Sequence, residues 1–124
     1  MLEALEMGRP LEGAAVLIGQ APSLIKRYIG LAERFQGDLF AADDRRLGAV
    51  WRRPRGVVAA IVPWNVPVMN VLIRAAPALA AGNSIVIKPS EYSPRSAVLL
   101  AMLASEAGIP NGVFNVVLGS GAEA

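Results

Sequence analysis

The stretch between Gly56 and Glu91 constrains the fold of this chain more than any other part of the sequence. It opens with an uninterrupted apolar run at residues 57–62, which is typical of a strand covered on both faces. A second apolar run, at residues 84–87, follows a segment of helix length. Each run stops at a polar turn, the first at residues 63–65 and the second at residues 88–91. The polar residues of this stretch therefore concentrate where a buried strand ends.

A third buried strand is predicted at residues 113–118, which completes the order strand, helix, strand, helix, strand. Pro67 suits the first turn of the first helix and Gly82 its left-handed end, while Ser93 and Pro94 suit the cap and first turn of the second. Crossovers of this kind are right-handed and give a parallel sheet, which predicts an α/β fold. Both polar turns lie where such sheets bind ligands, outside the carboxyl ends of the strands. The apolar side of the second helix is expected at Val98, Leu99, Met102 and Leu103.

The part before this alternation is predicted to be mainly helical up to about residue 45. A helix from Pro22 to about Gln36 is amphipathic, and we expect Tyr28 and Phe35 in the core. Residues 46–53 are predicted as a strand of a β-hairpin that leads into the strand at residue 57. The 124 residues fit one domain, mainly helical over 1–45 and alternating strand with helix over 46–124.

Two motifs, Pro63-Trp64-Asn65 and Lys88-Pro89-Ser90-Glu91, occur in this order with the segment PALAAGN between them and GIPNGVFNVVLGSG after them. Together they closely resemble the aldehyde dehydrogenase superfamily, from about Arg53 to Gly121. The resemblance implies the N-terminal, cofactor-binding part of an NAD(P)-dependent enzyme that oxidises an aldehyde to a carboxylic acid. It also implies a Rossmann-like sheet that is incomplete relative to the family.

The chemistry of that family, as the resemblance implies it, needs a cysteine nucleophile and a general-base Glu. This chain has no Cys and ends at Ala124, before the segments that carry those two residues in the family. We therefore expect a partial chain that is inactive alone. The alternatives are a non-catalytic nucleotide-binding or interaction module derived from the same fold, and a small fold that binds nothing.

Asn65 is the candidate catalytic residue. A fixed amide N–H donor lowers the barrier to forming an alkoxide from an aldehyde carbonyl, and the resemblance assigns this role to the Asn of the first motif. The alternative is that Asn65 only caps the helix that follows Pro67.

Lys88 and Glu91 match the family positions that bind the adenosine ribose, because an ammonium donor and a carboxylate acceptor satisfy its two hydroxyls. A carboxylate repels a 2'-phosphate, so Glu91 favours NAD, with NADP possible. By resemblance Trp64 and Pro63 belong to the nicotinamide-side wall, although Trp64 is also compatible with a core position. The candidate cofactor-binding residues are Ile61, Pro63, Trp64, Asn65, Lys88, Ser90, Glu91 and Gly121.

Composition argues against several other classes of protein. The net charge of +2 gives no broad field for nucleic acid, and the run of Arg between residues 45 and 55 fits a solvated hairpin edge. Without Cys or His we expect no disulfide, no metal site and a cytoplasmic protein. The uncharged stretch at residues 56–73 holds Pro63, Asn65 and Pro67 at its centre, which argues against a membrane span. An open sheet edge predicts a homo-oligomer or self-association.

Overall fold

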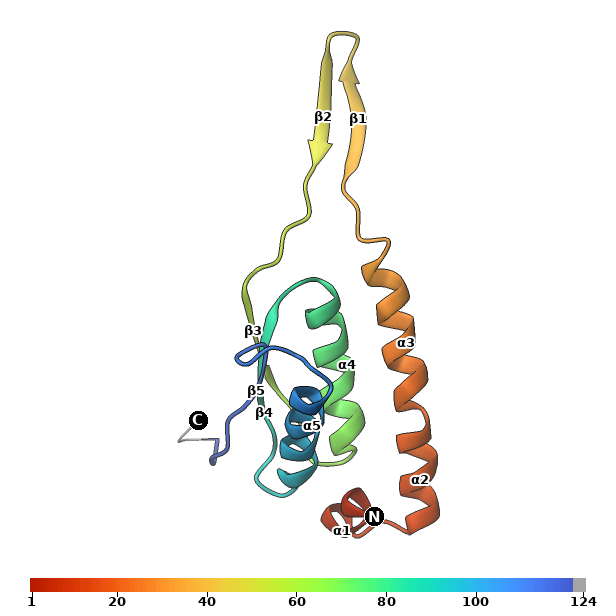
Figure 1. Ribbon diagram of the computed structural model, residues 1–124, viewed down its shortest axis with the longest axis vertical. Helices are drawn as coiled ribbons and strands as arrows, with labels where there is room; N and C mark the ends of the chain where they lie inside the picture. The colour runs from red at the N-terminus through yellow and green to blue at the C-terminus, as the bar shows by residue number, and fades with distance from the viewer. Residues whose placement is uncertain (122–124) are drawn as a thin grey trace.

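The computed structural model describes residues 1–121 of the 124. It has three parts, which are helices at the N-terminus, a hairpin that projects from the rest, and a small sheet with two helices (Figure 1). In chain order the elements are α1 (Leu2–Met7), α2 (Leu11–Gly19), α3 (Ala21–Ala32), β1 (Asp38–Asp43), β2 (Arg46–Val50), β3 (Val57–Ile61), α4 (Pro67–Ala80), β4 (Ser84–Lys88), α5 (Arg95–Glu106) and β5 (Phe114–Val116).

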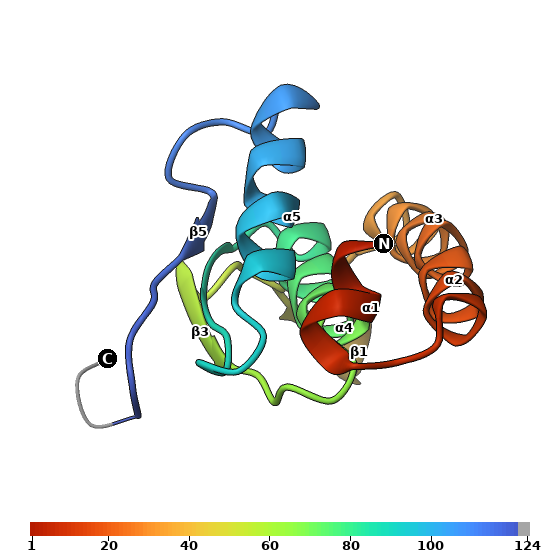
Figure 2. The same cartoon turned by 90° about the horizontal axis from the view of Figure 1, so that it is seen from below.

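The predicted parallel sheet is confirmed, with strand order β3-β4-β5 and all pairs parallel. Helices α4 and α5 cover one face of this sheet, and α2 and α3 lie beyond them (Figure 2). The core forms between the sheet and these helices because one face of each element is apolar. Its buried members are Val62, Val71, Ala75, Ala78, Ile85, Ile87 and Ala97.

The expectation that both faces of β3 are covered is wrong. Val57 and Ile61 are 67% and 78% exposed, whereas Val58 and Ala60 pack against the core. Both crossover helices lie on the same side of the sheet, so alternate residues of this edge strand face solvent (Figure 2). The apolar run thus predicted the strand correctly, but the prediction that both of its faces are buried was wrong.

Helix α4 begins and ends as predicted. Pro67 lies in its first turn, and Gly82 follows it with a φ of 79°, donating its N–H to the carbonyl of Leu79. Val71, Leu72 and Ala75 are buried, and Pro77 lies inside the helix. Among the described residues, no helix is both long and apolar enough to cross a membrane.

Helix α5 presents a different face from the one predicted. Its buried residues are Ser96 and Ala97, while Leu99, Met102 and Leu103 are exposed. Small side chains let this helix lie close to the sheet. Ser93 does not cap the helix either, because its hydroxyl donates to the carbonyl of Trp64 and the N-cap position is Pro94.

The helical N-terminal part is shorter than predicted. Helix α3 ends at Ala32 rather than near Gln36, since Arg34 and Phe35 donate to carbonyls three residues back. Phe35 is 53% exposed, so its predicted core position is wrong, and the Arg52 guanidinium lies 6.0 Å from its ring centroid. Tyr28 is half-buried.

The hairpin pairs β1 with β2 antiparallel, and it forms a sheet of its own. The sequence predicted the second strand but assigned no strand to residues 38–43, where β1 runs. At its tip, the Asp43 carboxylate accepts from the Arg45 N–H and from Arg46 Nε. These bonds, with that to Arg46 foremost, lower the pKa of Asp43.

Candidate functional site

The two polar turns meet at one edge of the sheet, beyond the carboxyl ends of β3 and β4. Ile61 lies opposite Lys88 in the parallel register, and the Val62 N–H donates to the Lys88 carbonyl at 3.0 Å. The Ser93 hydroxyl donates to the Trp64 carbonyl at 3.2 Å. We call this edge the rim, and it comprises residues 63–65 and 88–91. Two strand ends thus bring together residues that are more than twenty positions apart in the chain.

Asn65 is exposed at the rim, but its atoms are held from two sides. Its side-chain Oδ1 accepts from Asn70 Nδ2 at 3.1 Å, and its backbone carbonyl accepts from an Arg9 guanidinium nitrogen at 3.1 Å. The N-cap of α4 is Val66, whose side chain makes no capping hydrogen bond. The alternative in which Asn65 serves only as a helix cap is therefore contradicted.

Lys88 is 8% exposed, which is unusual for an ammonium group. Its Nζ donates to the Pro89 carbonyl at 2.9 Å and lies 4.0 Å from Glu91 Oε2. The Glu91 side chain is half exposed, and the Ser90 hydroxyl lies 3.5 Å from its Oε2. The stem of Lys88 is thus buried beside an accessible carboxylate.

The remaining candidates differ in how firmly they belong to the rim. Trp64 is 52% exposed, so the core alternative for it is wrong, and Pro63 is exposed beside it. Ile61 projects from the open face at the end of β3. Gly121 lies in the loop after β5, and open space surrounds the position that a Cβ would take there. No described contact joins Gly121 to the rim.

Two carboxylates of α1 support the site, and the sequence analysis missed both. Glu6 accepts from the Arg95 and Ser96 N–H groups and from the Ser96 hydroxyl, at the start of α5. Glu3 Oε2 accepts from the Val68 N–H in the first turn of α4. Acidic groups at helix N-termini are stabilising, and these two replace the side-chain caps that α4 and α5 lack. No local pattern in the sequence indicated these pairs, because Asn65 and Ser93 stood as cap candidates for the two helices.

Glu3 and Glu6 are in different environments. Glu3 is 1% exposed, and its Oε1 is buried with no hydrogen-bond partner among residues 1–121. Burial raises the pKa of Glu3 above its ordinary value, while the Val68 N–H and the charge of Arg9 oppose the shift. Glu6 is half-buried and has three donors.

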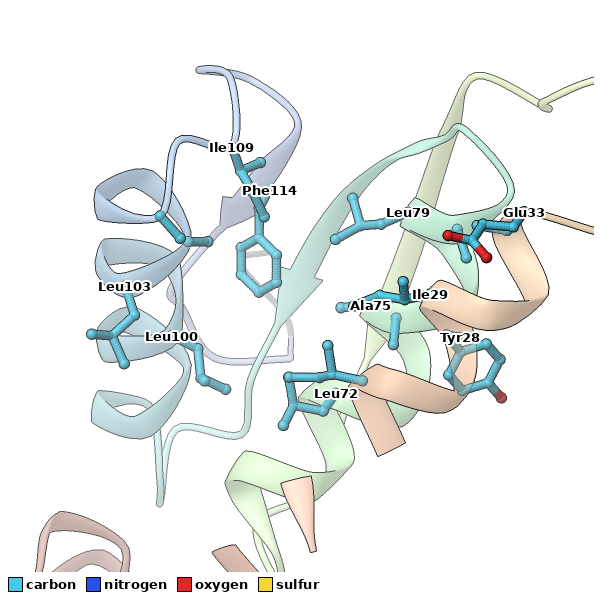
Figure 3. Close-up of a pocket in the computed structure, with 16 residues that line it drawn as sticks. Tyr28, Ile29, Glu33, Leu72, Ala75, Leu79, Leu100, Leu103, Ile109 and Phe114 are labelled. Atoms are coloured by element: carbon cyan, nitrogen blue, oxygen red, sulfur yellow. The ribbon is translucent and has the colours of Figure 1, made fainter. Parts of the chain in front are cut away.

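An apolar groove lies away from the rim. It has a volume of about 600 Å³ and runs between α3, α4 and α5, where Leu72, Leu100 and Phe114 point toward one another (Figure 3). Tyr28 of α3 and Glu33, which follows the end of that helix, contribute polar atoms to the groove. No candidate site residue lines this groove, so the chemistry predicted from the sequence is not located there.

Relatives of this chain are found over its whole length. The NADP/NAD-dependent aldehyde dehydrogenase PuuC of Escherichia coli (strain K12) is 45% identical over 125 residues, covering 100% of this chain and 25% of that protein. A mitochondrial succinate-semialdehyde dehydrogenase of Oryza sativa subsp. japonica is 42% identical, covering 99% of this chain and 24% of that protein.

Solved structures of aldehyde dehydrogenases are also similar to this chain over almost its whole length. The crystal structure of PnpE in complex with nicotinamide adenine dinucleotide superposes with a TM-score of 0.91 at 41% identity, over 98% of this chain and 25% of that one. This chain therefore spans about a quarter of the length of its relatives. The sequence profile described as the aldehyde dehydrogenase family matches residues 1–124. The chain belongs to the aldehyde dehydrogenase family.

Proposed function

We propose that this chain supplies the ribose clamp and one oxyanion donor of an NAD(P)-dependent aldehyde dehydrogenase that converts an aldehyde to a carboxylic acid. The observation that carries the proposal is the rim, where Asn65, Lys88 and Glu91 follow two hydrogen-bonded parallel strands. Relatives that are described as NADP/NAD-dependent, or that are solved with the dinucleotide, support the choice of cofactor.

The ribose clamp depends on donors and acceptors that remain free at the second turn. An ammonium group has three N–H donors, and Lys88 uses one of them on the Pro89 carbonyl. No other hydrogen bond from this nitrogen is described within residues 1–121, so two N–H donors can serve ribose hydroxyls, and the exposed Glu91 carboxylate accepts from a free 2'-hydroxyl. Trp64, Pro63 and Ile61 add apolar surface next to this pair. Ser90 orders the turn by accepting the Tyr92 N–H, and Gly121 leaves space for a close approach.

Asn65 serves the reacting carbonyl. Its amide N–H stabilises the negative charge that develops on the aldehyde oxygen when a nucleophile adds, because the donor is already in place. The bound dinucleotide would accept the hydride released from the aldehyde carbon. No residue of this chain can act as a cysteine nucleophile, so we propose that the chain alone has no turnover.

Calorimetric titration of the 124-residue chain with NAD and with NADP tests the clamp. We expect NAD to bind more tightly than NADP, because the Glu91 carboxylate repels the 2'-phosphate. Glu91→Gln removes that repulsion and should reduce the difference between the affinities for NAD and NADP. A well-folded chain that binds neither nucleotide would contradict the clamp.

A hybrid protein distinguishes two hypotheses: that the chain is part of an enzyme, or that it is a non-catalytic module. The absence of Cys favours the second. In this hybrid, residues 1–124 replace the matching quarter of PuuC. Oxidation of aldehydes by the hybrid supports the hypothesis that the chain is part of an enzyme. Nucleotide binding by a folded hybrid without oxidation supports the module.

We also propose that the chain self-associates and that it is cytoplasmic. Exposed apolar side chains of the hairpin and its flank support self-association, namely Leu39, Phe40, Leu47 and Trp51. The absence of Cys favours a reducing compartment. Light scattering should show a mass above one chain at high concentration, and a sharp monomer peak there would contradict self-association.

A further inference from the structure

Asn70 is a polar residue on the buried side of α4, between Met69 and Val71. It is 8% exposed. Burying an amide lowers stability unless its donors and acceptors are satisfied, so the partners of Asn70 indicate what it does there.

Two of these partners fix the orientation of the Asn70 carboxamide. The Pro63 carbonyl can only accept, and Asn70 Nδ2 lies 3.3 Å from it. The Arg74 guanidinium can only donate, and its nitrogen lies 3.4 Å from Asn70 Oδ1 and 3.0 Å from the Asn70 carbonyl. A reversed carboxamide would place oxygen against oxygen and donor against donor. Both neighbours therefore select the same orientation.

That orientation determines how Asn65 must point. Asn70 Nδ2 also lies 3.1 Å from Asn65 Oδ1, and a donor in that place requires an oxygen opposite it. Since the two branches of a carboxamide diverge, Asn65 Nδ2 is turned away from Asn70. No described hydrogen bond uses that nitrogen. Arg9 holds the backbone carbonyl of the same residue, so both ends of Asn65 are anchored.

We propose that Asn70 is the positioning residue of Asn65, and that its side-chain N–H keeps the Asn65 Nδ2 donor directed outward at the rim. The inference rests on the proposed role of Asn65 as an oxyanion donor. A donor held in place before the reaction needs no reorganisation when charge develops, whereas an exposed, unanchored Asn samples several rotamers. A purely structural Asn70 would need only the Pro63 and Arg74 contacts.

Nuclear magnetic resonance of the ¹⁵N-labelled 124-residue chain tests this inference through the side-chain amide signals of Asn65. Asn70→Asp still accepts from Arg74 but cannot donate. We expect Asn65 to turn its Nδ2 toward the new carboxylate, so that exchange of its amide hydrogens with water slows by about fivefold, as for one added hydrogen bond.

A second variant removes the Asn70 side-chain N–H donor without adding a charge. Asn70→Leu keeps the volume and makes no hydrogen bond, and we expect the Asn65 side chain to become mobile, with a lower ¹⁵N order parameter. The matched control is Asn115→Asp, because Asn115 Nδ2 also donates to two oxygens, the carbonyls of Ile85 and Gly112. This control should leave the Asn65 signals unchanged.

The outcomes separate the two proposals. Asn65 signals that are the same in both Asn70 variants as in the native chain would overturn the positioning role. NAD titration of the same samples reports on the clamp, since the Asn70 variants leave Lys88 and Glu91 intact and should change the affinity for NAD only slightly. A native chain that binds no NAD, with Asn65 still responding to Asn70, would refute the proposed function and keep the positioning contact.

Discussion

The two turns of the rim lie side by side but are held by different means. The turn at residues 63–65 is held by Asn70 in the next helix and by two distant residues, Arg9 and Ser93. The turn at residues 88–91 is held within itself, by bonds from Lys88 to Pro89 and from Tyr92 to Ser90. A local turn keeps its shape wherever its strand is formed, whereas the first turn requires the N-terminal helices to be docked.

This difference assigns different tasks to the two turns. A group that must meet developing charge within a few tenths of an ångström benefits from support on several sides, as Asn65 has. A clamp that binds hydroxyl groups tolerates more freedom, and Glu91 is half exposed accordingly. Variants of each turn should therefore alter different measured quantities.

The largest effect is expected at the first turn. In the hybrid protein, Asn65→Ala removes an oxyanion donor and should lower kcat by about a hundredfold to a thousandfold. The affinity for NAD should change much less than kcat, because Lys88 and Glu91 are intact. Steady-state kinetics measures kcat, and calorimetry measures the affinity. Asn111→Ala, at an exposed turn before β5, is the matched control, and an equal loss of kcat in that control would contradict the role of Asn65.

The opposite pattern is expected at the second turn. Lys88→Met keeps the buried stem but removes the ammonium, and should weaken NAD binding by about tenfold to a hundredfold, since hydrogen bonds to charged groups are among the stronger ones. At saturating NAD the hybrid should keep most of its kcat. Calorimetry on the 124-residue chain measures the affinity, with the exposed Lys26→Met as control. An unchanged affinity for NAD in Lys88→Met would contradict the proposal that this turn binds the ribose.

The sequence predicted the local features of the site and missed the distant ones. Strands β3 and β4 and their turns were identified because apolar runs and motifs lie within a few residues of each other. Glu6 and Ser96 are separated by 90 positions, and Glu3 and Val68 by 65, so no short pattern contains them. Strand β1 was missed because its residues are exposed and show no buried periodicity. The face of α5 was misjudged because residues 97–104 are apolar on all sides.

A third prediction tests how far the first turn depends on α1. Glu6→Ala removes the acceptor for the first N–H groups of α5 and should lower the free energy of unfolding by about 1–2 kcal/mol. Urea unfolding of the 124-residue chain measures this change. Glu12→Ala, an exposed carboxylate on α2, should change it by less than about 0.5 kcal/mol. Amide signals of residues 63–65 should move in the Glu6 variant while those of residues 88–91 stay in place. Equal shifts of the amide signals in both turns would show that the two turns depend on α1 to the same extent.

The smallest effect concerns Glu3, whose raised pKa makes its contribution depend on pH. Because the folded chain holds the Glu3 proton to a higher pH than the unfolded chain, Glu3 favours folding below its ordinary pKa of 4.5 and loses that contribution as the pH rises through the folded value. Glu3→Gln stays neutral and can still accept from the Val68 N–H. Its free energy of unfolding relative to the native chain should therefore be higher near neutral pH than below pH 4.5. Urea unfolding at the two pH values measures the difference, and a variant whose relative stability falls as the pH rises would show that the Glu3 carboxylate is stabilised, not penalised, where it supports α4.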